Sequence, residues 1–287
     1  MDFTIITPSY NYGQFIGECL ESVAVQKGVS FEHLVMDAGS NDGTSGVVSL
    51  HPHVSFCQEP DRGMSDGINK GFAKAQGEWV MWLNADDRLR PGALAEVKQF
   101  AEEHPEADVV FGCWNFVDEE GRFLRRMTLF PFRQRMLANH MCYIASTSTF
   151  YRRSTTIGEG HLLNEKFGCV MDGEYYCRLA KAGKRFEYLP CVLAEFRLHE
   201  GSISQRHLSK TDVDGVLARQ LQLAESRTIH RSYGVRLFRD ELTNGVVEGL
   251  LFYFYRAQKG LLRLVHRGSC CEPRVGRDRK GGSGKGS

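Results

Sequence analysis

The run WVMWLNADD at residues 79–87 constrains the fold of this chain more than any other feature. Its apolar half predicts a buried strand, and Asp86 and Asp87 follow where that strand ends. Adjacent carboxylates repel each other, so one of them takes up a proton unless a cation compensates the charge. Oxygen ligands of this kind suit Mg²⁺ or Mn²⁺, and these ions in turn suit a diphosphate. Helix capping is the alternative, but the expected first helical residue, Pro91, lies too far downstream.

The first hundred residues alternate between strand-like and helix-like segments. Strands are expected at residues 3–7, 33–36, 54–56 and 79–83, and helices from residue 15 onward, at 65–75 and at 91–103. This alternation predicts an α/β fold with a Rossmann-like, mostly parallel central sheet and helices on both faces. Such sheets bind ligands beyond the carboxyl ends of their strands, and Asp37 lies at one of these ends, as do the acids at residues 86 and 87.

The pattern divides the chain into three parts. An α/β domain is expected at 1–205, a mostly helical extension at 206–267, and a disordered tail, basic and rich in Gly and Ser, at 268–287. Within the first part, further strands are expected at residues 108–111, 114–117, 146–151, 186–189 and 192–196.

The extension ends in an apolar and aromatic helix expected at residues 246–265. It contains Glu248, Arg256, Lys259 and Arg263, so it is too charged to span a bilayer. Two interpretations stay open. The helix docks on the α/β domain, or it lies in the surface of a bilayer, with basic residues beside its aromatic belt. The second interpretation predicts peripheral membrane association through the C-terminal helices.

Composition excludes several classes of protein. A net charge of +1 on 287 residues argues against a nucleic-acid partner bound through bulk electrostatics. The nine cysteines are scattered without a C-x-x-C pair, so we expect a reducing compartment and neither a zinc site nor a catalytic thiol. We see no secretory signal, that is, no basic segment followed by an apolar one, before the first strand. We therefore expect a cytoplasmic protein, either free or peripheral on the inner face of the cell membrane.

Two strand-to-turn junctions are expected on the edge that carries the acids, at TPSYN (residues 7–11) and DAGSNDGT (residues 37–44). The ring of Tyr10 can stack on a flat base, and Asp37 or Asp42 can accept hydrogen bonds from a base or from ribose hydroxyls. Local turn chemistry is the alternative for both loops. It is strongest for Asp42, which could open the next helix.

In this order, the motifs resemble those of family-2 glycosyltransferases with the GT-A fold, of the group that assembles bacterial polysaccharides and lipid-linked glycans. The resemblance covers residues 2–205 and includes EPDRG at 59–63, DGINKG at 66–71, DGEYY at 172–176 and LHEGSIS at 198–204. It implies an inverting enzyme that moves a sugar from a nucleotide-diphosphate sugar to a hydroxyl of a glycan or lipid-linked acceptor. It also implies Mn²⁺ or Mg²⁺ as the cofactor.

The resemblance assigns roles to individual residues along the sheet edge. The implied nucleotide-sugar ligands are Pro8, Tyr10, Asp37, Arg62, Asp66, Asn69 and Asp86. The implied metal ligands are Asp86, Asp87 and His199, the last from a loop that closes over the donor. Two positions depart from the family pattern: Ala38 and Asn84 stand where many relatives have acids. Base recognition through this segment is therefore less well defined, and Asp86 is the better metal ligand.

Asp172 is the expected catalytic base. Inverting transfer needs a carboxylate that takes the proton of the acceptor hydroxyl. Glu174 is the second candidate, but two residues apart on a helix the side chains point to different sides. Composition alone fits Asp172 equally well as the N-cap of its helix. Arg197 is an alternative to His199 as the contact for the diphosphate.

Two other functions compete with this prediction. A nucleotidyltransferase also combines an α/β nucleotide domain with acidic metal ligands, but it needs a basic, Gly-rich loop after its first strand. Residues 7–13 contain no basic residue. A non-catalytic sugar- or lipid-binding module is the second alternative, and the intact acids at positions 37, 86, 87 and 172 argue against it.

Overall fold

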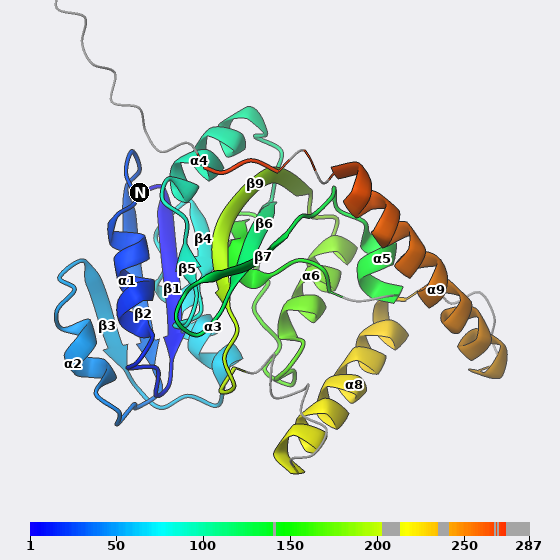
Figure 1. The fold of residues 1–287 in the computed structure, drawn as a ribbon, viewed down its shortest axis with the longest axis horizontal. Coiled ribbons are helices and arrows are strands. Elements are labelled where there is room, and N and C mark those ends of the chain that lie inside the picture. The colour runs from blue at the N-terminus through cyan, green and yellow to red at the C-terminus, as the bar shows by residue number, and fades with distance from the viewer. Residues whose placement is uncertain (140–141, 203–212, 235–240, 267, 269, 274–287) are drawn as a thin grey trace, which may run out of the picture.

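The computed structural model describes residues 1–139, 142–202, 213–234, 241–266, 268 and 270–273. Within them, a nine-stranded sheet has the order β3-β2-β1-β4-β8-β6-β9-β5, with β7 paired to β6 (Figure 1). Helices flank the sheet, and two long helices follow at the C-terminal side. This is the α/β architecture with a helical extension that the alternating pattern predicts.

The strands are β1 (Phe3–Ser9), β2 (Phe31–Asp37), β3 (Val54–Gln58), β4 (Trp79–Trp82), β5 (Arg88–Leu89), β6 (Val109–Val117), β7 (Phe123–Met127), β8 (Thr149–Arg152) and β9 (Phe186–Arg197). The helices are α1 (Ile16–Ala24), α2 (Thr44–Val48), α3 (Met64–Lys74), α4 (Ala93–Glu103), α5 (Gln134–Asn139), α6 (Met171–Lys181), α8 (Val213–Tyr233) and α9 (Glu241–His266). Two 3-10 turns are η1 (Ser146–Ser148) and η2 (Ile157–Glu159).

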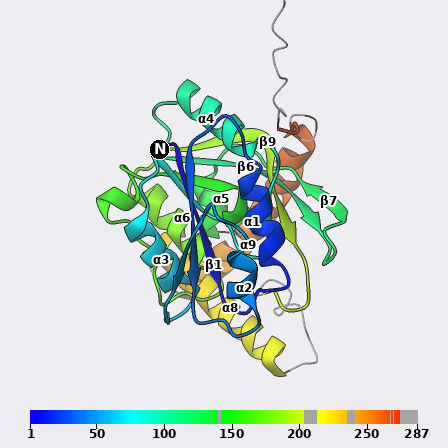
Figure 2. The same ribbon diagram turned by 90° about the vertical axis from the view of Figure 1, so that its left-hand side faces the viewer.

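The first half of the sheet is parallel and is covered on both faces. Strands β3, β2, β1 and β4 pair in parallel, so their carboxyl ends meet at one edge. Thr7 of β1 contacts Cys19 of α1, whereas its neighbour Ile6 faces Gly71 of α3. Successive side chains of a strand point to opposite faces, and Figure 2 shows α1 and α3 on opposite sides of β1. A Cβ atom at Gly71 would lie 2.6 Å from Ile6 Cγ2, so only glycine allows this close approach.

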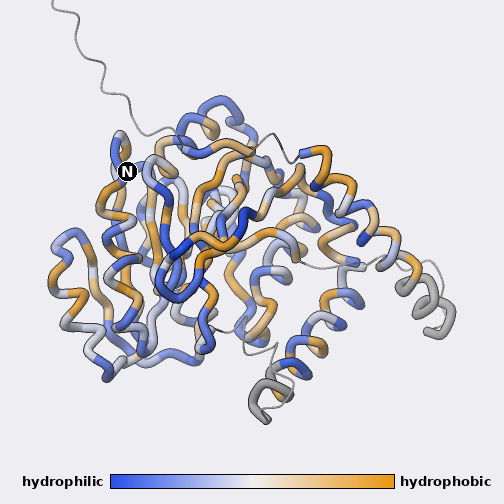
Figure 3. The backbone as a smooth tube through the Cα atoms, viewed as in Figure 1, coloured by the Kyte–Doolittle hydropathy of each residue, from blue (hydrophilic) through white to orange (hydrophobic). Residues whose placement is uncertain are grey.

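The second half of the sheet is mixed. Strand β8 pairs antiparallel with both β4 and β6, β6 pairs in parallel with β9, and β5 adds to β9 in antiparallel orientation. The separate strands expected at 108–117 form one strand, β6, and those at 186–196 form β9. The β6–β9 register shifts around Cys113, and this irregularity lets the two ladders continue through the predicted break. The apolar strands lie in the interior of the domain (Figure 3).

Among the predicted boundaries that differ from the structure, two bear on the site. Helix α4 begins at Ala93 after Gly92, whose φ of 82° is left-handed, so Pro91 precedes the helix instead of opening it. The strand expected from residue 146 begins as the 3-10 turn η1. Asp87 still lies upstream of α4, so the conclusion that the acidic pair does not cap this helix stands.

The C-terminal extension consists of α8 and α9, which lie beyond α6 and α5 (Figure 1). Of the helices in the described ranges, none is long and apolar enough to cross a membrane. The tail expected to be disordered from residue 268 starts with a placed segment. Cys271 forms an isolated backbone β-bridge with Cys191 of β9, and both thiols are free. The N–H of Cys271 donates to the carbonyl of Pro190 at 2.9 Å. The predicted boundary at residue 205 and the tail at 274–287 lie outside the described residues.

Candidate active site at the carboxyl ends of the strands

A carboxylate and an imidazole meet beyond the ends of β4 and β9. Asp86 Oδ2 lies 3.0 Å from His199 Nε2, and the side chains of both residues are less than 10% exposed. The His199 ring packs on Phe15, with ring centroids 4.5 Å apart, and lies near Tyr12. The structure thus brings together two of the three residues predicted as metal ligands.

The third predicted ligand, Asp87, is directed into the protein. Its side chain is 1% exposed. Oδ1 accepts the backbone N–H of Arg197 at 3.0 Å, Oδ2 accepts the side-chain amide of Asn84 at 3.3 Å, and Thr147 faces the carboxylate. Burial, followed by the charge of Asp86, raises the pKa of Asp87 well above its usual value. A positive charge beside Asp86 would relieve this repulsion.

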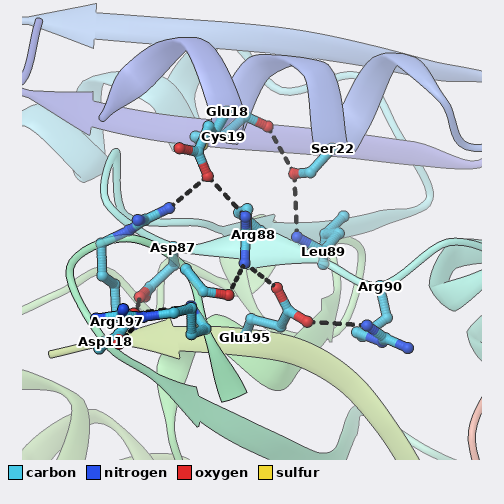
Figure 4. A network of polar contacts seen from close by, with 12 residues as sticks. Glu18, Cys19, Ser22, Asp87, Arg88, Leu89, Arg90, Asp118, Glu195 and Arg197 are labelled. Carbon is cyan, nitrogen blue, oxygen red and sulfur yellow. Dashed lines mark hydrogen bonds and ion pairs between the residues drawn. The ribbon is translucent and has the colours of Figure 1, made fainter. Parts of the chain in front are cut away.

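Arg197 holds the acidic turn in place (Figure 4). Its guanidinium is 1% exposed. Nε donates to the backbone carbonyl of Asp86 at 2.9 Å, Nη2 to Glu18 at 2.7 Å, and Nη1 to the backbone carbonyl of Glu119. Every guanidinium nitrogen is therefore engaged within the protein. The prediction that Arg197 contacts the diphosphate is wrong, because this side chain supports the end of β4.

Glu18 of α1 is a supporting residue that the sequence did not reveal. It pairs with Arg197 and also with Arg88, at 2.6 Å, and Arg88 in turn pairs with Glu195 (Figure 4). Glu18 and Arg197 are 179 residues apart, so no local pattern links them. The only sequence signal is general, an acidic residue on the first helix after β1.

Asp37 lies at the end of β2, next to Ser9 of β1, as predicted. It is 1% exposed, and it accepts the N–H of Gly39 at 3.0 Å, the N–H of Ser40 at 2.8 Å and the side-chain amide of Gln58 at 3.0 Å. Burial alone would raise the pKa of Asp37, but these hydrogen bonds, with that of the Ser40 hydroxyl, outweigh it and lower the pKa. Its carboxylate fixes the loop after β2.

Tyr10 is 59% exposed just beyond β1, whereas Pro8 is buried within that strand. The loops after β1 and β2 are tied together by Asn11, which has a left-handed φ of 58° and accepts the N–H of Asn41 at 3.0 Å. Asp42 accepts hydrogen bonds from Gly13 and Thr44, which supports its interpretation as a turn residue. Tyr10 presents an exposed ring on which a base could stack, whereas the carboxylate of Asp42, though exposed, is engaged within the turn.

The residues predicted to line the base and ribose of the nucleotide lie at the start of α3. Asp66 accepts the backbone N–H of Arg62 at 3.0 Å and its guanidinium at 3.1 Å, and this pairing holds the pKa of Asp66 below its usual value. The Arg62 side chain is 74% exposed and also pairs with Glu165. The side-chain amide of Asn69 exchanges two hydrogen bonds with the backbone of Leu163. Asp66 and Asn69 thus order the loops, and Arg62 presents charge to solvent.

Asp172 is the second residue of α6. The N-cap is Val170, so the alternative of Asp172 as N-cap does not hold. Its Oδ1 accepts the N–H of Gly173 at 2.7 Å. The residue is half-buried, and burial raises the pKa of Asp172 to about 6. Glu174, the second candidate for the catalytic base, is 3% exposed. Its carboxylate accepts a hydrogen bond from Nε of Arg178 at 3.0 Å.

The segment from η1 to β8 lies between the two acidic regions. Thr147 faces Asp87 at one end of this segment. At the other end Tyr151 stacks on Trp82 of β4, with ring centroids 5.2 Å apart. The hydroxyl of Tyr151 also donates to that of Tyr176 at 3.2 Å, and Tyr176 belongs to α6, the helix that carries Asp172. Helix α6 and the acids after β4 therefore contact the same short segment.

The donor set beyond β4 fits a metal ion only if substrate completes the coordination. Across the described part of the chain, no group of three or more His, Cys, Asp or Glu side chains is arranged to hold a metal by itself. Asp86 and His199 supply two candidate donors. Mg²⁺ is usually held by one or two carboxylates together with waters and substrate phosphates. The residues present fit an ion shared with a diphosphate.

Comparison with known proteins decides the family. The model of the family described as glycosyl transferase family 2 matches residues 4–157, more than half of the chain. The chain belongs to glycosyl transferase family 2. It is a glycosyltransferase that uses a nucleotide-sugar donor, and the nucleotidyltransferase and binding-module alternatives are set aside.

Relatives and solved structures agree with this assignment. The glycosyltransferase is 28% identical over 231 residues to a PGL/p-HBAD biosynthesis glycosyltransferase of Mycobacterium bovis, covering 77% of this chain and 84% of that protein. Its fold is similar to that of Staphylococcus aureus TarS in complex with UDP-GlcNAc, with a TM-score of 0.59 and 18% identity over 93% of this chain and 91% of that one. It also resembles a mannosyltransferase of Pyrobaculum calidifontis in complex with GDP-Man and Mn²⁺, with a TM-score of 0.54 and 20% identity over 92% and 85% of the two chains.

Proposed function

We propose that this glycosyltransferase is an inverting, metal-dependent enzyme that transfers a sugar to a hydroxyl of a glycan or lipid-linked acceptor in a single displacement. The observation that carries the proposal is the Asp86–His199 pair at 3.0 Å, beyond the strand ends where a nucleotide diphosphate would lie. A half-buried acid with a raised pKa, Asp172, belongs to α6, and this helix contacts β8 through the Tyr151–Tyr176 hydrogen bond.

The acid–base chemistry is assigned to Asp172. The acceptor oxygen attacks the anomeric carbon while the bond from this carbon to the diphosphate oxygen breaks, and the nucleoside diphosphate leaves with the electron pair. The hydroxyl proton passes to the carboxylate of Asp172. A pKa of about 6 suits a base near neutral pH, because the group is ionised yet still has affinity for a proton.

The donor side binds the nucleotide diphosphate and its cation. We assign Asp86 and His199 as the metal ligands, and Asp87 as the buried acid that fixes the turn through the backbone of Arg197 and the side chain of Asn84. Mn²⁺ or Mg²⁺ bound there would neutralise charge on the leaving diphosphate. Tyr10 would stack on the base and Arg62 would meet an anionic group of the donor. The Mn²⁺ and GDP-Man in the mannosyltransferase neighbour, and the UDP-GlcNAc in TarS, support a donor of this class.

The acceptor is proposed to be lipid-linked and reached at the cytoplasmic face of a membrane. Helix α9 presents an exposed apolar stripe whose large side chains are each between 60 and 69% exposed: Leu250, Tyr253, Phe254, Leu261, Leu264 and Val265. No acidic residue occurs between positions 249 and 271. An amphipathic helix of this kind suits the surface of a bilayer that contains anionic lipids.

A donor screen tests the proposed function. Nucleotide release is measured from UDP-, GDP- and dTDP-sugars with Mn²⁺ or Mg²⁺, with EDTA as the control. We expect release from one nucleotide class, its loss with EDTA and its recovery when Mn²⁺ is restored. The anomeric configuration of the product, read by NMR, tests inversion. Full activity in EDTA, or retained configuration, would refute the proposal.

A further inference from the structure

A carboxylate from the C-terminal extension reaches the loop that leads into α6. Glu225 of α8 is 7% exposed, and its oxygens accept three successive backbone N–H groups, those of Gly168 at 2.8 Å, Cys169 at 2.9 Å and Val170 at 3.0 Å. Val170 is the N-cap of α6, and its side chain makes no capping hydrogen bond. These three N–H groups belong to the turn that precedes the helix, and a local N-cap side chain accepts instead from the second or third helical residue. Here the acceptor lies 55 residues away from the N-cap.

The same face of α8 contacts the first turn of α6. Glu225, Ile229 and Tyr233 are four residues apart, so they share one side of the helix. Ile229 is 6% exposed, and its Cδ1 lies 3.7 Å from the position that a Cβ atom of Gly173 would take. The hydroxyl of Tyr233 donates to Glu174 at 2.9 Å. In Figure 1, α8 lies next to α6 on the side away from the N-terminal strands.

The charge on Glu225 is stabilised by backbone amides. Within the ranges that the structure describes, Glu225 forms no ion pair, and its three hydrogen bonds all come from the 168–170 turn. A buried carboxylate is costly to desolvate, and three hydrogen bonds to an ionised acceptor offset part of that cost. This arrangement makes the placement of α6 depend on the docking of α8.

We propose that Glu225 is a positioning residue for the proton-accepting step: by holding the 168–170 turn, it directs Asp172 at the acceptor hydroxyl. The inference rests on the proposed role of Asp172 as the base. Asp172 is two residues from Val170, so a displaced turn displaces the carboxylate. A misplacement of about 1 Å can cost about 10²-fold in rate. Donor binding is expected to change little, because Tyr10, Asp37 and Asp86 lie at the ends of β1, β2 and β4. Of the residues around the start of α3, Asn69 and Arg62 contact Leu163 and Glu165, upstream of the turn.

The test uses Glu225→Ala and Glu225→Gln in the full-length enzyme, with saturating donor and acceptor. We expect kcat of Glu225→Ala to fall about 30- to 100-fold, with the donor KM within about twofold of the native value. Glu225→Gln keeps the side-chain volume and one acceptor oxygen, so a smaller loss is expected. It serves as the test variant if Glu225→Ala does not fold. A raised donor KM with unchanged kcat would overturn the proposal.

A double-mutant cycle with Asp172→Asn separates positioning from general damage. Because Glu225 acts through Asp172, Glu225→Ala is expected to change kcat by less than about threefold in the Asp172→Asn background. A loss as large as in the native background would refute the positioning role. If Asp172→Asn alone leaves kcat unchanged, the base assignment fails, whatever Glu225→Ala does, and the proposal falls with it.

Two controls address a purely structural role. Tyr233→Phe removes another hydrogen bond between α8 and α6, and it is expected to lower the melting temperature while leaving kcat within about threefold. Formate, a small carboxylate that fits the vacated position, is expected to restore part of kcat to Glu225→Ala. Equal losses of kcat in the Tyr233 and Glu225 variants, or no response to formate, would contradict the proposal.

Discussion

The proposed donor side of the site and the proposed acceptor side are stabilised in different ways. On the donor side, Asp37 and Asp66 accept hydrogen bonds from amides three and four residues away. On the acceptor side, the turn before Asp172 is held by Glu225 of the C-terminal extension. The donor side is therefore largely organised by its own loops, whereas the acceptor side needs α8. Donor binding and sugar transfer are expected to be separable.

The largest effect is expected from Asp86→Ala. Loss of this carboxylate removes a proposed metal ligand, and a metal at the leaving phosphate is worth several kcal/mol, so transfer is expected to fall about 10³-fold or more. Calorimetry of UDP or GDP binding, with and without Mn²⁺, measures the donor side directly. Glu120→Ala, an exposed acid on the β6–β7 turn, is the control. Undiminished Mn²⁺-dependent binding in Asp86→Ala would remove Asp86 from the metal site.

A smaller effect is expected from Arg197→Lys. Lysine keeps the charge but loses the planar fork that joins the carbonyl of Asp86 to Glu18. Groups that orient metal ligands typically account for about 10- to 100-fold in affinity or activity. We expect a loss of this size, with raised KM values for donor and Mn²⁺. Arg153→Lys is the control, because Arg153 donates to the carbonyl of Gly77 before β4, far from the strand ends. Equal kinetics in the two variants would contradict the supporting role.

The smallest effect on catalysis is expected from the α9 stripe. A double substitution, Leu261→Asp with Leu264→Asp, should weaken sedimentation with phosphatidylglycerol-containing vesicles at least about tenfold, since each buried leucine contributes roughly 1.5–3 kcal/mol. Transfer to a water-soluble acceptor should stay within about twofold. Leu50→Asp, an exposed leucine after α2, is the matched control. Vesicle binding that survives the double substitution would remove α9 from the membrane contact.

The sequence predicted the strand ends and turns on the proposed donor side, because their signals are local. Strand ends, turn residues and the acidic run all lie within short stretches, and parallel pairing brings them to one edge. The same reasoning indicated the pairing of strands less well in the second half of the sheet, where β8 runs antiparallel between β4 and β6. There the order depends on long-range contacts that periodicity does not encode.

The supporting residues of the site could not be predicted for the same reason. Glu18 meets Arg197 across 179 residues, and Glu225 meets the α6 turn across 55 to 57. Both are acids on amphipathic helices, where most acids face solvent. Arg197 is an alternative diphosphate contact in the sequence because its charge can be read there, whereas its burial cannot. Only packing in three dimensions distinguishes a substrate contact from a support.

The pH dependence of transfer at saturating donor tests the division between the two sides most directly. The pKa of Asp172 is raised to about 6, so this carboxyl is protonated below that pH and cannot accept the hydroxyl proton. The native rate is expected to rise with pH up to about 6 and then level off. Asp172→Asn should lower the plateau about 10²–10⁴-fold and abolish this rise, with unchanged affinity for donor. Native turnover in Asp172→Asn, or a rise that persists in it, would contradict the assignment of the base.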